Sequence, residues 1–118
     1  MNSYLALIIG AIIGSSFRYL FSLLNLSVSG LPISTVIVNI VGSSLAGYFL
    51  NKFNDTSYIF LYIGLFGSFT TLSSFNIELF NLINEKLFMN AFLFFFLNIF
   101  LSFLFFYLSY LLSLKIAN

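Results

Sequence analysis

The sequence predicts an all-α membrane protein with four transmembrane helices, the third of them broken in mid-membrane. Of the 118 residues, 61% are hydrophobic and only 6% are charged, whereas soluble domains carry about 25% charged residues. The charge-free runs reach the roughly 20 residues that an α-helix needs to cross a bilayer. These runs do not alternate apolar and polar residues as β-barrel strands do, so helices are the remaining way to span the membrane.

Seven charged residues divide the chain into apolar segments. They are Arg18, Lys52, Asp55, Glu78, Glu85, Lys86 and Lys115. From the runs between them we expect a single four-helix domain over residues 1–118. Its spans are expected near residues 3–24, 32–51, 57–83 and 88–114.

The first span carries a GxxxG pattern and one cation. Gly10 and Gly14 in "GAIIG" favour close packing against another helix. Arg18 follows on the same span, about two turns from its end, so its long side chain can reach the membrane interface. An arginine inside a pore would hold an anion too tightly for fast passage. We therefore expect Arg18 to anchor the helix or to line a vestibule.

The second and fourth spans each carry an amide side chain within an apolar run. Asn39 lies in "TVIVNIVGSS", and Asn98 lies one helical turn before Ser102. Polar groups in hydrocarbon cost free energy unless they are paired, which makes them candidates for function. Each amide could line an ion path, or it could hold two spans together through an interhelical hydrogen bond worth about 1 kcal/mol. The residues alone leave both interpretations open.

The third span contains the segment "GLFGSFTTLSSF", which runs from Gly64 to Phe75. Glycine is a poor helix former, and serine and threonine compete with the backbone for hydrogen bonds. The segment therefore favours a helix break, the alternative being an unbroken helix with a polar face. A break in mid-membrane exposes backbone carbonyls, which are tolerated where they line a cavity, face protein or bind an ion. A ring of such carbonyls from two copies would suit a buried Na⁺.

Glu78 follows this segment by three residues. A buried acid can relay protons or bind a cation, and an acid at the interface can pair with a basic group. We expect Glu78 to lie at the mouth of the site.

The remaining composition excludes several classes of function. The chain has no Cys and no His, which removes disulfides, thiolate nucleophiles and imidazole bases. The net charge of +1 gives no indication of nucleic-acid binding. Lys52 and Lys115 lie at one end of the predicted bundle and Arg18 and Lys86 at the other, so the positive-inside rule selects no orientation. We therefore expect insertion in both orientations, and pairing of two copies as an antiparallel dimer.

Three motifs give the chain a resemblance to a known family. The segments "GAIIGSSFRY", "LPISTVIVNIVGSSLAG" and "GLFGSFTTLSSF", together with the length and the four-span layout, resemble the small fluoride channels called Fluc or CrcB. The resemblance covers nearly the whole chain. It implies a channel and not an enzyme, in the inner (plasma) membrane among lipid, which exports cytoplasmic fluoride passively. It also implies a dual-topology dimer with two antiparallel pores and a central structural Na⁺.

The family's functional positions can be carried onto this chain residue by residue. The backbone carbonyls of Gly67 and Thr70 match the positions that hold the Na⁺. Arg18 and Glu78 are expected in the vestibule from their own positions in the spans, as argued above. The expected fluoride pathway comprises Asn39, Thr71, Leu72, Ser73, Ser74, Phe75, Asn98 and Ser102. Neutral amide and hydroxyl donors suit fluoride, because each is weak enough to release the ion again.

Two residues depart from the family's pattern. Leu72 stands where the first of two phenylalanines is expected, and Ser68 stands where a glycine is common. A phenyl ring has a positive edge that can face an anion, and leucine offers none. Either Phe75 suffices in a homodimer, which is the arrangement we expect, or a related partner subunit supplies the second ring.

Two other functions fit a chain of this size. A small multidrug or cation antiporter with dual topology also has four helices, but it needs an acid in the first span, where this chain has Arg18. A scaffold subunit that transports nothing would pair its polar side chains with one another and leave no continuous polar track.

Overall fold

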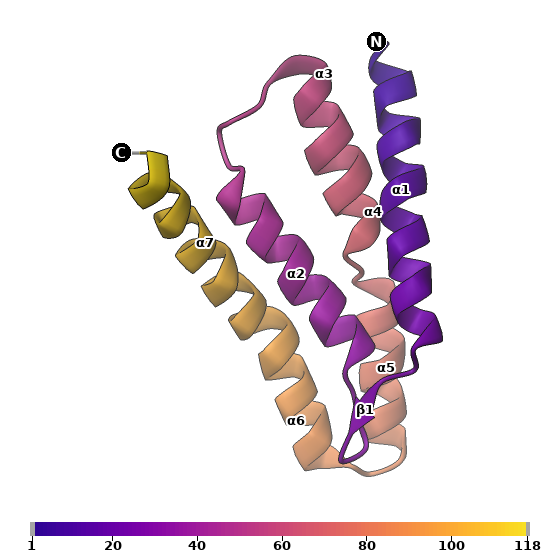
Figure 1. The fold of residues 1–118 in the computed structure, drawn as a ribbon. Helices are drawn as coiled ribbons and strands as arrows, with labels where there is room; N and C mark the ends of the chain where they lie inside the picture. Colours follow the sequence, from indigo (N-terminus) through magenta and orange to yellow (C-terminus); the bar gives the residue numbers. More distant parts are fainter. Residues whose placement is uncertain (1, 118) are drawn as a thin grey trace.

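Helices account for most of the chain in this computed structural model, which describes residues 2–117. Four long segments run up and down beside one another, so both ends of the chain lie at the same end of the molecule (Figure 1). The arrangement is flat, with principal extents of 48 × 33 × 19 Å. A molecule this thin leaves most of its helix surface outside any core.

The first half of the chain contains two helices joined by a small hairpin. Its elements are α1 (Ser3–Leu23), β1 (Ser27–Val28), β2 (Leu31–Pro32) and α2 (Ser34–Tyr48). Asn2 caps α1, since its side-chain oxygen accepts a hydrogen bond from the Tyr4 N–H at 2.7 Å. Ser29 and Gly30 both have positive φ angles, 54° and 82°, as a tight two-residue hairpin turn requires. The apolar pattern of the sequence gave no sign of this hairpin.

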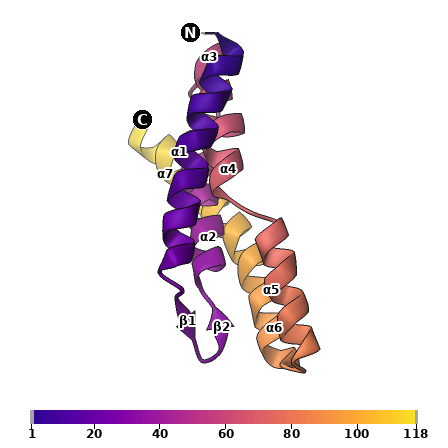
Figure 2. The same ribbon diagram turned by 90° about the vertical axis from the view of Figure 1, so that its right-hand side faces the viewer.

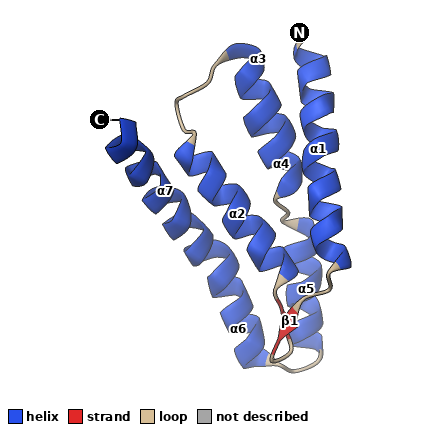
Figure 3. Ribbon diagram, viewed as in Figure 1, coloured by secondary structure: helices blue, strands red, loops and turns tan. Residues whose placement is uncertain are grey.

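The third segment is a helix with an interruption. It comprises α3 (Asp55–Tyr58), the π-helix η1 (Ile59–Phe66), α4 (Gly67–Phe69) and α5 (Ser73–Asn84). Directly after α4 the chain is extended at Thr70, with φ −77° and ψ 160°, and at Leu72 it returns to helical backbone angles before α5 begins. Figure 3 shows this interruption as the loop between α4 and α5. Of the two conformations that the sequence left open here, the structure has the broken helix.

The fourth segment is one continuous helix with a single π-helical stretch, where its turns are wider. It comprises α6 (Phe88–Phe96), the π-helix η2 (Leu97–Leu101) and α7 (Ser102–Ala117). The wide turns of η2 contain Asn98, which is buried. Single π-turns within α-helices are often found at functional sites.

Glycines allow α1 and the third segment to approach at backbone contact. A Cβ atom on Gly10 would collide with the Phe60 carbonyl oxygen, and one on Gly14 would collide with the Leu65 carbonyl oxygen. Gly64 lies directly opposite Gly10. The packing role expected for the GxxxG pattern is confirmed, and its partner is the third segment of the same chain.

The lower half of the third segment packs differently. Figure 2 shows α5 and α6 lying side by side, apart from α1. Together with β2 and α2 they form the main cluster of buried apolar residues, which contains Leu31, Val36, Phe75, Leu82, Ala91 and Phe94. Phe75 and Phe94 stack with their ring centroids 5.4 Å apart.

The helices have the length and composition of membrane spans. Within residues 2–117, three stretches are long and apolar enough to cross a bilayer, Ser3–Leu23, Asp55–Asn84 and Phe88–Ala117. The apolar helix α2, at 15 residues, is shorter. Large apolar side chains such as Phe92 and Phe103 are about two-thirds exposed, at 65% and 67%. These surfaces fit a multi-pass membrane protein surrounded by lipid or by another chain.

Candidate functional site

The interruption in the third segment is held by the side chain of Asn39 from α2. Its Oδ1 accepts a hydrogen bond from the Thr71 N–H at 2.8 Å, and its Nδ2 donates to the Thr71 carbonyl at 3.1 Å. The amide thus pairs with both backbone polar groups of Thr71, directly after the extended residue Thr70. Because unpaired backbone groups are costly in a membrane, this pairing stabilises the break.

The same amide also reaches the fourth segment. Asn39 Nδ2 donates a second hydrogen bond to Asn98 Oδ1 at 2.8 Å. Asn98 in turn donates from its Nδ2 to the Phe94 carbonyl at 3.0 Å. The two amides that the sequence placed in separate spans therefore form one network, which joins α2, the interruption and η2.

Hydroxyl groups complete the first turn after the interruption. The Thr71 Oγ1 accepts a hydrogen bond from the Ser74 N–H at 3.1 Å and lies 3.4 Å from the Ser73 hydroxyl. Thr71 lies one residue before Leu72, the N-cap of α5, and its oxygen satisfies a free N–H in the first turn of that helix. Three residues expected in the fluoride pathway therefore gather here, and two of them take part in capping α5.

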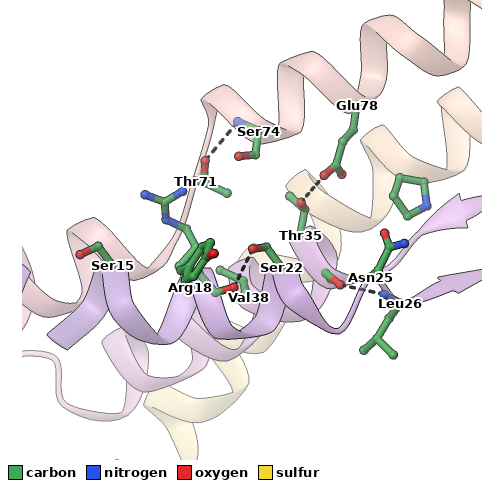
Figure 4. A pocket seen from close by; sticks show the side chains of 13 residues that line it. Ser15, Arg18, Ser22, Asn25, Leu26, Thr35, Val38, Thr71, Ser74 and Glu78 are labelled. Atoms are coloured by element: carbon green, nitrogen blue, oxygen red, sulfur yellow. Dashed lines mark hydrogen bonds between the residues drawn. The ribbon is translucent and has the colours of Figure 1, made fainter. Parts of the chain in front are cut away.

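Arg18 supports the interruption from the other side. Its Nε donates a hydrogen bond to the Ser68 carbonyl at 2.9 Å. Ser68 itself donates to the Ala11 carbonyl at 3.1 Å, so the serine that replaces the common glycine ties α4 to α1. Arg18 therefore binds a carbonyl near the end of α4, and its guanidinium extends from α1 toward the interrupted segment (Figure 4).

A polar cavity of about 320 Å³ lies beside the interruption. Its walls include Arg18 and Glu78, together with side chains of Thr71 and Ser74 (Figure 4). Residues of the hairpin, such as Pro32, border it at one end. The two vestibule residues and two of the pathway hydroxyls expected from the sequence thus line a common space.

Glu78 is held in this cavity by Thr35 of α2. The Thr35 hydroxyl donates to Glu78 Oε1 at 2.8 Å. The other carboxylate oxygen, Oε2, is buried and has no hydrogen-bond partner within the described part of the chain. A buried polar atom without a partner calls for water, an ion or a donor from another chain.

Several expected pathway residues lie away from the cavity. Leu72 is 66% exposed on the outer surface, and Ser73 beside it is also exposed. Phe75 is only 4% exposed and stacks inside the core on Phe94. Ser102 is buried, and its hydroxyl has no partner among the described residues. Within one copy, these side chains and the cavity residues do not form a single channel.

Part of the cavity wall was not predicted from the sequence. Thr35 precedes Asn39 by one helical turn, so the spacing could have assigned it to the same face. The other polar side chains of the wall that were not expected are Ser15, Tyr19, Ser22, Asn25 and Ser34.

Comparisons with known proteins agree on one family. A family model described as CrcB-like protein, Camphor Resistance (CrcB), matches residues 5–110. A "Fluoride-specific ion channel FluC" of Shewanella piezotolerans (strain WP3 / JCM 13877) is 39% identical over 100 residues, which cover 79% of this chain and 81% of the relative. A "Fluoride-specific ion channel FluC 3" of Methanosarcina barkeri (strain Fusaro / DSM 804) is 36% identical over 93 residues, or 73% and 70% of the two chains. A "Fluoride-specific ion channel FluC" of Elusimicrobium minutum (strain Pei191) is 36% identical over 97 residues, 78% of each chain.

Proposed function

We propose that this chain, which belongs to the CrcB-like family, is a fluoride-selective ion channel of the plasma membrane. It is a multi-pass membrane protein and not an enzyme. Fluoride passes down its electrochemical gradient, so the channel relieves the cytoplasm of accumulated fluoride without an energy source.

The observation that carries this proposal is the set of neutral donors at the interruption. Asn39, Thr71 and Ser74 lie together there, and the last two border the polar cavity. Fluoride is small and strongly hydrated, so a path for it must offer donors that replace water. Neutral donors also release the ion again, which a fixed cation in the narrow part of the path would not do readily.

We assign the residues to two parts of the path. Arg18 and Glu78 belong to the vestibule, where they border the cavity at its polar walls. The narrow pathway comprises Asn39, Thr71, Leu72, Ser73, Ser74, Phe75, Asn98 and Ser102. Among residues 2–117 the buried hydroxyl of Ser102 has no hydrogen-bond partner, which supports its place in this set, since such a donor is suited to an ion.

The path requires a second chain, and we propose an antiparallel dimer with two pores. Leu72 and Ser73 face outward from the interruption, where a partner could meet them. The balance of Lys52 and Lys115 against Arg18 and Lys86 supports insertion of the copies in both orientations. A single flat layer of four helical segments encloses no route for an ion, so the partner must supply the other wall.

We further propose a structural Na⁺ between the two copies. Within residues 2–117 the backbone oxygens of Gly67 and Thr70 accept no hydrogen bond, and Gly67 is exposed. Free carbonyl oxygens suit a hard cation, so the residues present fit this ion. When bound, the ion would neutralise the carbonyl dipoles that the break leaves unpaired.

The partner is proposed to be an identical copy, with a related subunit as the alternative because of Leu72. The small dual-topology antiporter is not favoured, since the first segment has Arg18 and no acidic residue.

The test is fluoride efflux from liposomes that hold this purified chain alone, read with a fluoride electrode and with chloride as the control anion. We expect fast fluoride efflux and no chloride efflux. The variant Asn39→Leu should abolish efflux while the dimer stays folded, because leucine removes the amide donors and weakens the pairing of Thr71 by about 1–3 kcal/mol.

Asn84→Leu is the matched control, since Asn84 is exposed at the far end of α5. It should carry fluoride like the unaltered chain. A folded, dimeric sample without efflux would contradict the homodimer, and recovery on co-expression with a related subunit would establish the heterodimer. Efflux that Asn39→Leu leaves unchanged would remove Asn39 from the path.

A further inference from the structure

We infer that Asn98 is a positioning residue. It holds the side-chain amide of Asn39 against the interruption, and so determines how that amide is oriented when an ion arrives. The part of this inference that concerns transport rests on the proposed fluoride channel. The part that concerns the hydrogen-bond network stands on the geometry alone.

The orientation of Asn98 is determined by its own helix. Its Nδ2 donates to the Phe94 carbonyl, one turn earlier, at 3.0 Å. Since an amide has its donors on one side and its acceptor on the other, this bond turns Oδ1 toward α2. Asn98 is only 5% exposed, so solvent offers no competing partner.

Asn39 then has no free donor. One N–H of its amide binds the Thr71 carbonyl, and the other binds Asn98 Oδ1 at 2.8 Å. Its own Oδ1 binds the Thr71 N–H. All the hydrogens of the amide that the sequence singles out for an anion are therefore engaged before any ion arrives.

An ion that binds Asn39 must replace one of these two acceptors. Loss of the Thr71 bond would leave a backbone carbonyl unpaired at the break, which is costly in a membrane. Asn98 Oδ1 is the acceptor that can be displaced at smaller cost, because a side chain can rotate away from Asn39 whereas the Thr71 carbonyl is part of the backbone. Asn98 therefore holds the second N–H of Asn39 in place while the site is empty and yields it to fluoride.

Ser113 provides a matched control on the same segment. It is 1% exposed, and its hydroxyl donates to the Tyr110 carbonyl at 2.8 Å within its own helix. Ser113 thus has comparable burial and a local hydrogen bond, but it lies outside the network.

The experiment compares the unaltered chain with Asn98→Leu and Ser113→Ala. Leucine fills nearly the same space and removes both hydrogen bonds of Asn98. NMR in micelles should show hydrogen exchange of the Thr71 N–H at least about tenfold faster in Asn98→Leu, and an upfield shift of one side-chain amide proton of Asn39. Fluoride efflux per folded dimer should fall at least about tenfold. Ser113→Ala should match the unaltered chain in all three measurements.

A second variant covers the case in which Asn98→Leu does not fold. In Asn98→Ser the short hydroxyl can bond the Phe94 carbonyl but cannot reach Asn39, and the same changes at Thr71 and Asn39 are expected. Unchanged exchange at Thr71 together with unchanged Asn39 amide protons would overturn the inference. Altered NMR signals with fluoride efflux within about twofold of normal would also overturn the positioning role in transport. If the unaltered chain carries no fluoride at all, the proposed function fails, while the NMR result still decides the network.

Discussion

The two halves of the third segment are held by opposite means. Above the interruption, α3, η1 and α4 lie against α1, with Gly10 and Gly14 at backbone contact. Below it, α5 lies against α6 through the stacked rings of Phe75 and Phe94. One half is thus positioned by the absence of side chains and the other by large side chains.

The two kinds of packing differ in how far each half can shift when a side chain changes. Backbone at contact distance has no rotamers, so any added atom must separate the two helices. Aromatic side chains can shift within their packing, and a smaller residue leaves a cavity without moving the helix. We therefore expect the upper half to act as a fixed support and the lower half to carry the adjustable part of the path.

The largest effect is expected from Gly14→Leu, which tests the fixed half. A side chain at this position would collide with the Leu65 carbonyl and the Ser68 hydroxyl. The chain should lose at least about 3 kcal/mol of stability and yield little monodisperse protein in size-exclusion chromatography.

Ser16→Leu makes the same kind of enlargement two residues away, where Ser16 is exposed. It should give normal amounts of monodisperse protein. Equal yields from the two variants would show that the contact between α1 and the third segment is not tight.

A smaller effect is expected from Phe75→Ile, which tests the adjustable half. The change removes the stack on Phe94 and the ring edge that the proposed path uses. The protein should remain folded, with about 1–3 kcal/mol less stability in thermal unfolding, and fluoride efflux should fall about tenfold.

Phe103→Ile is the control for lost aromatic surface, because Phe103 is 67% exposed and lies outside this stack. Its efflux should equal that of the unaltered chain. If Phe75→Ile did so too, the ring would have no part in conduction.

The smallest effect is expected from Leu72→Phe, at the junction of the two halves. Leu72 is 66% exposed, so stability should change by no more than about 0.5 kcal/mol. Fluoride efflux from homodimers should rise about two- to fivefold, because the added ring provides a positive edge for the anion.

Ile77→Phe adds the same ring elsewhere on α5, where Ile77 is 61% exposed, and it should leave efflux unchanged. A loss of efflux in Leu72→Phe alone would show that leucine is required at this position. That result would favour a partner subunit that supplies the ring.

The class of protein and the kind of residue at the site could both be predicted from the residues alone. Only seven of the 118 residues are charged, which predicts a membrane protein that spans the bilayer with helices. Gly67, Thr70 and the hydroxyls that follow them indicate a weak point in the third helix, because their intrinsic helix preference is low. The GxxxG pattern identified close packing in advance, since small residues at that spacing share one helix face.

Which of these groups contact one another depends on how the helices pack. Asn39 and Asn98 are 59 positions apart, and nothing in a periodic pattern reveals that their amides bond to each other and to Thr71. The partner of Arg18, the Ser68 carbonyl, is a backbone atom that any residue type could supply. Hydrogen bonds depend on distance and direction between atoms, whereas composition and spacing describe only one helix at a time. The same holds for Leu72 on the outer surface and Phe75 in the core. Their positions depend on the rotation of α5 about its axis, which follows from the interruption before it.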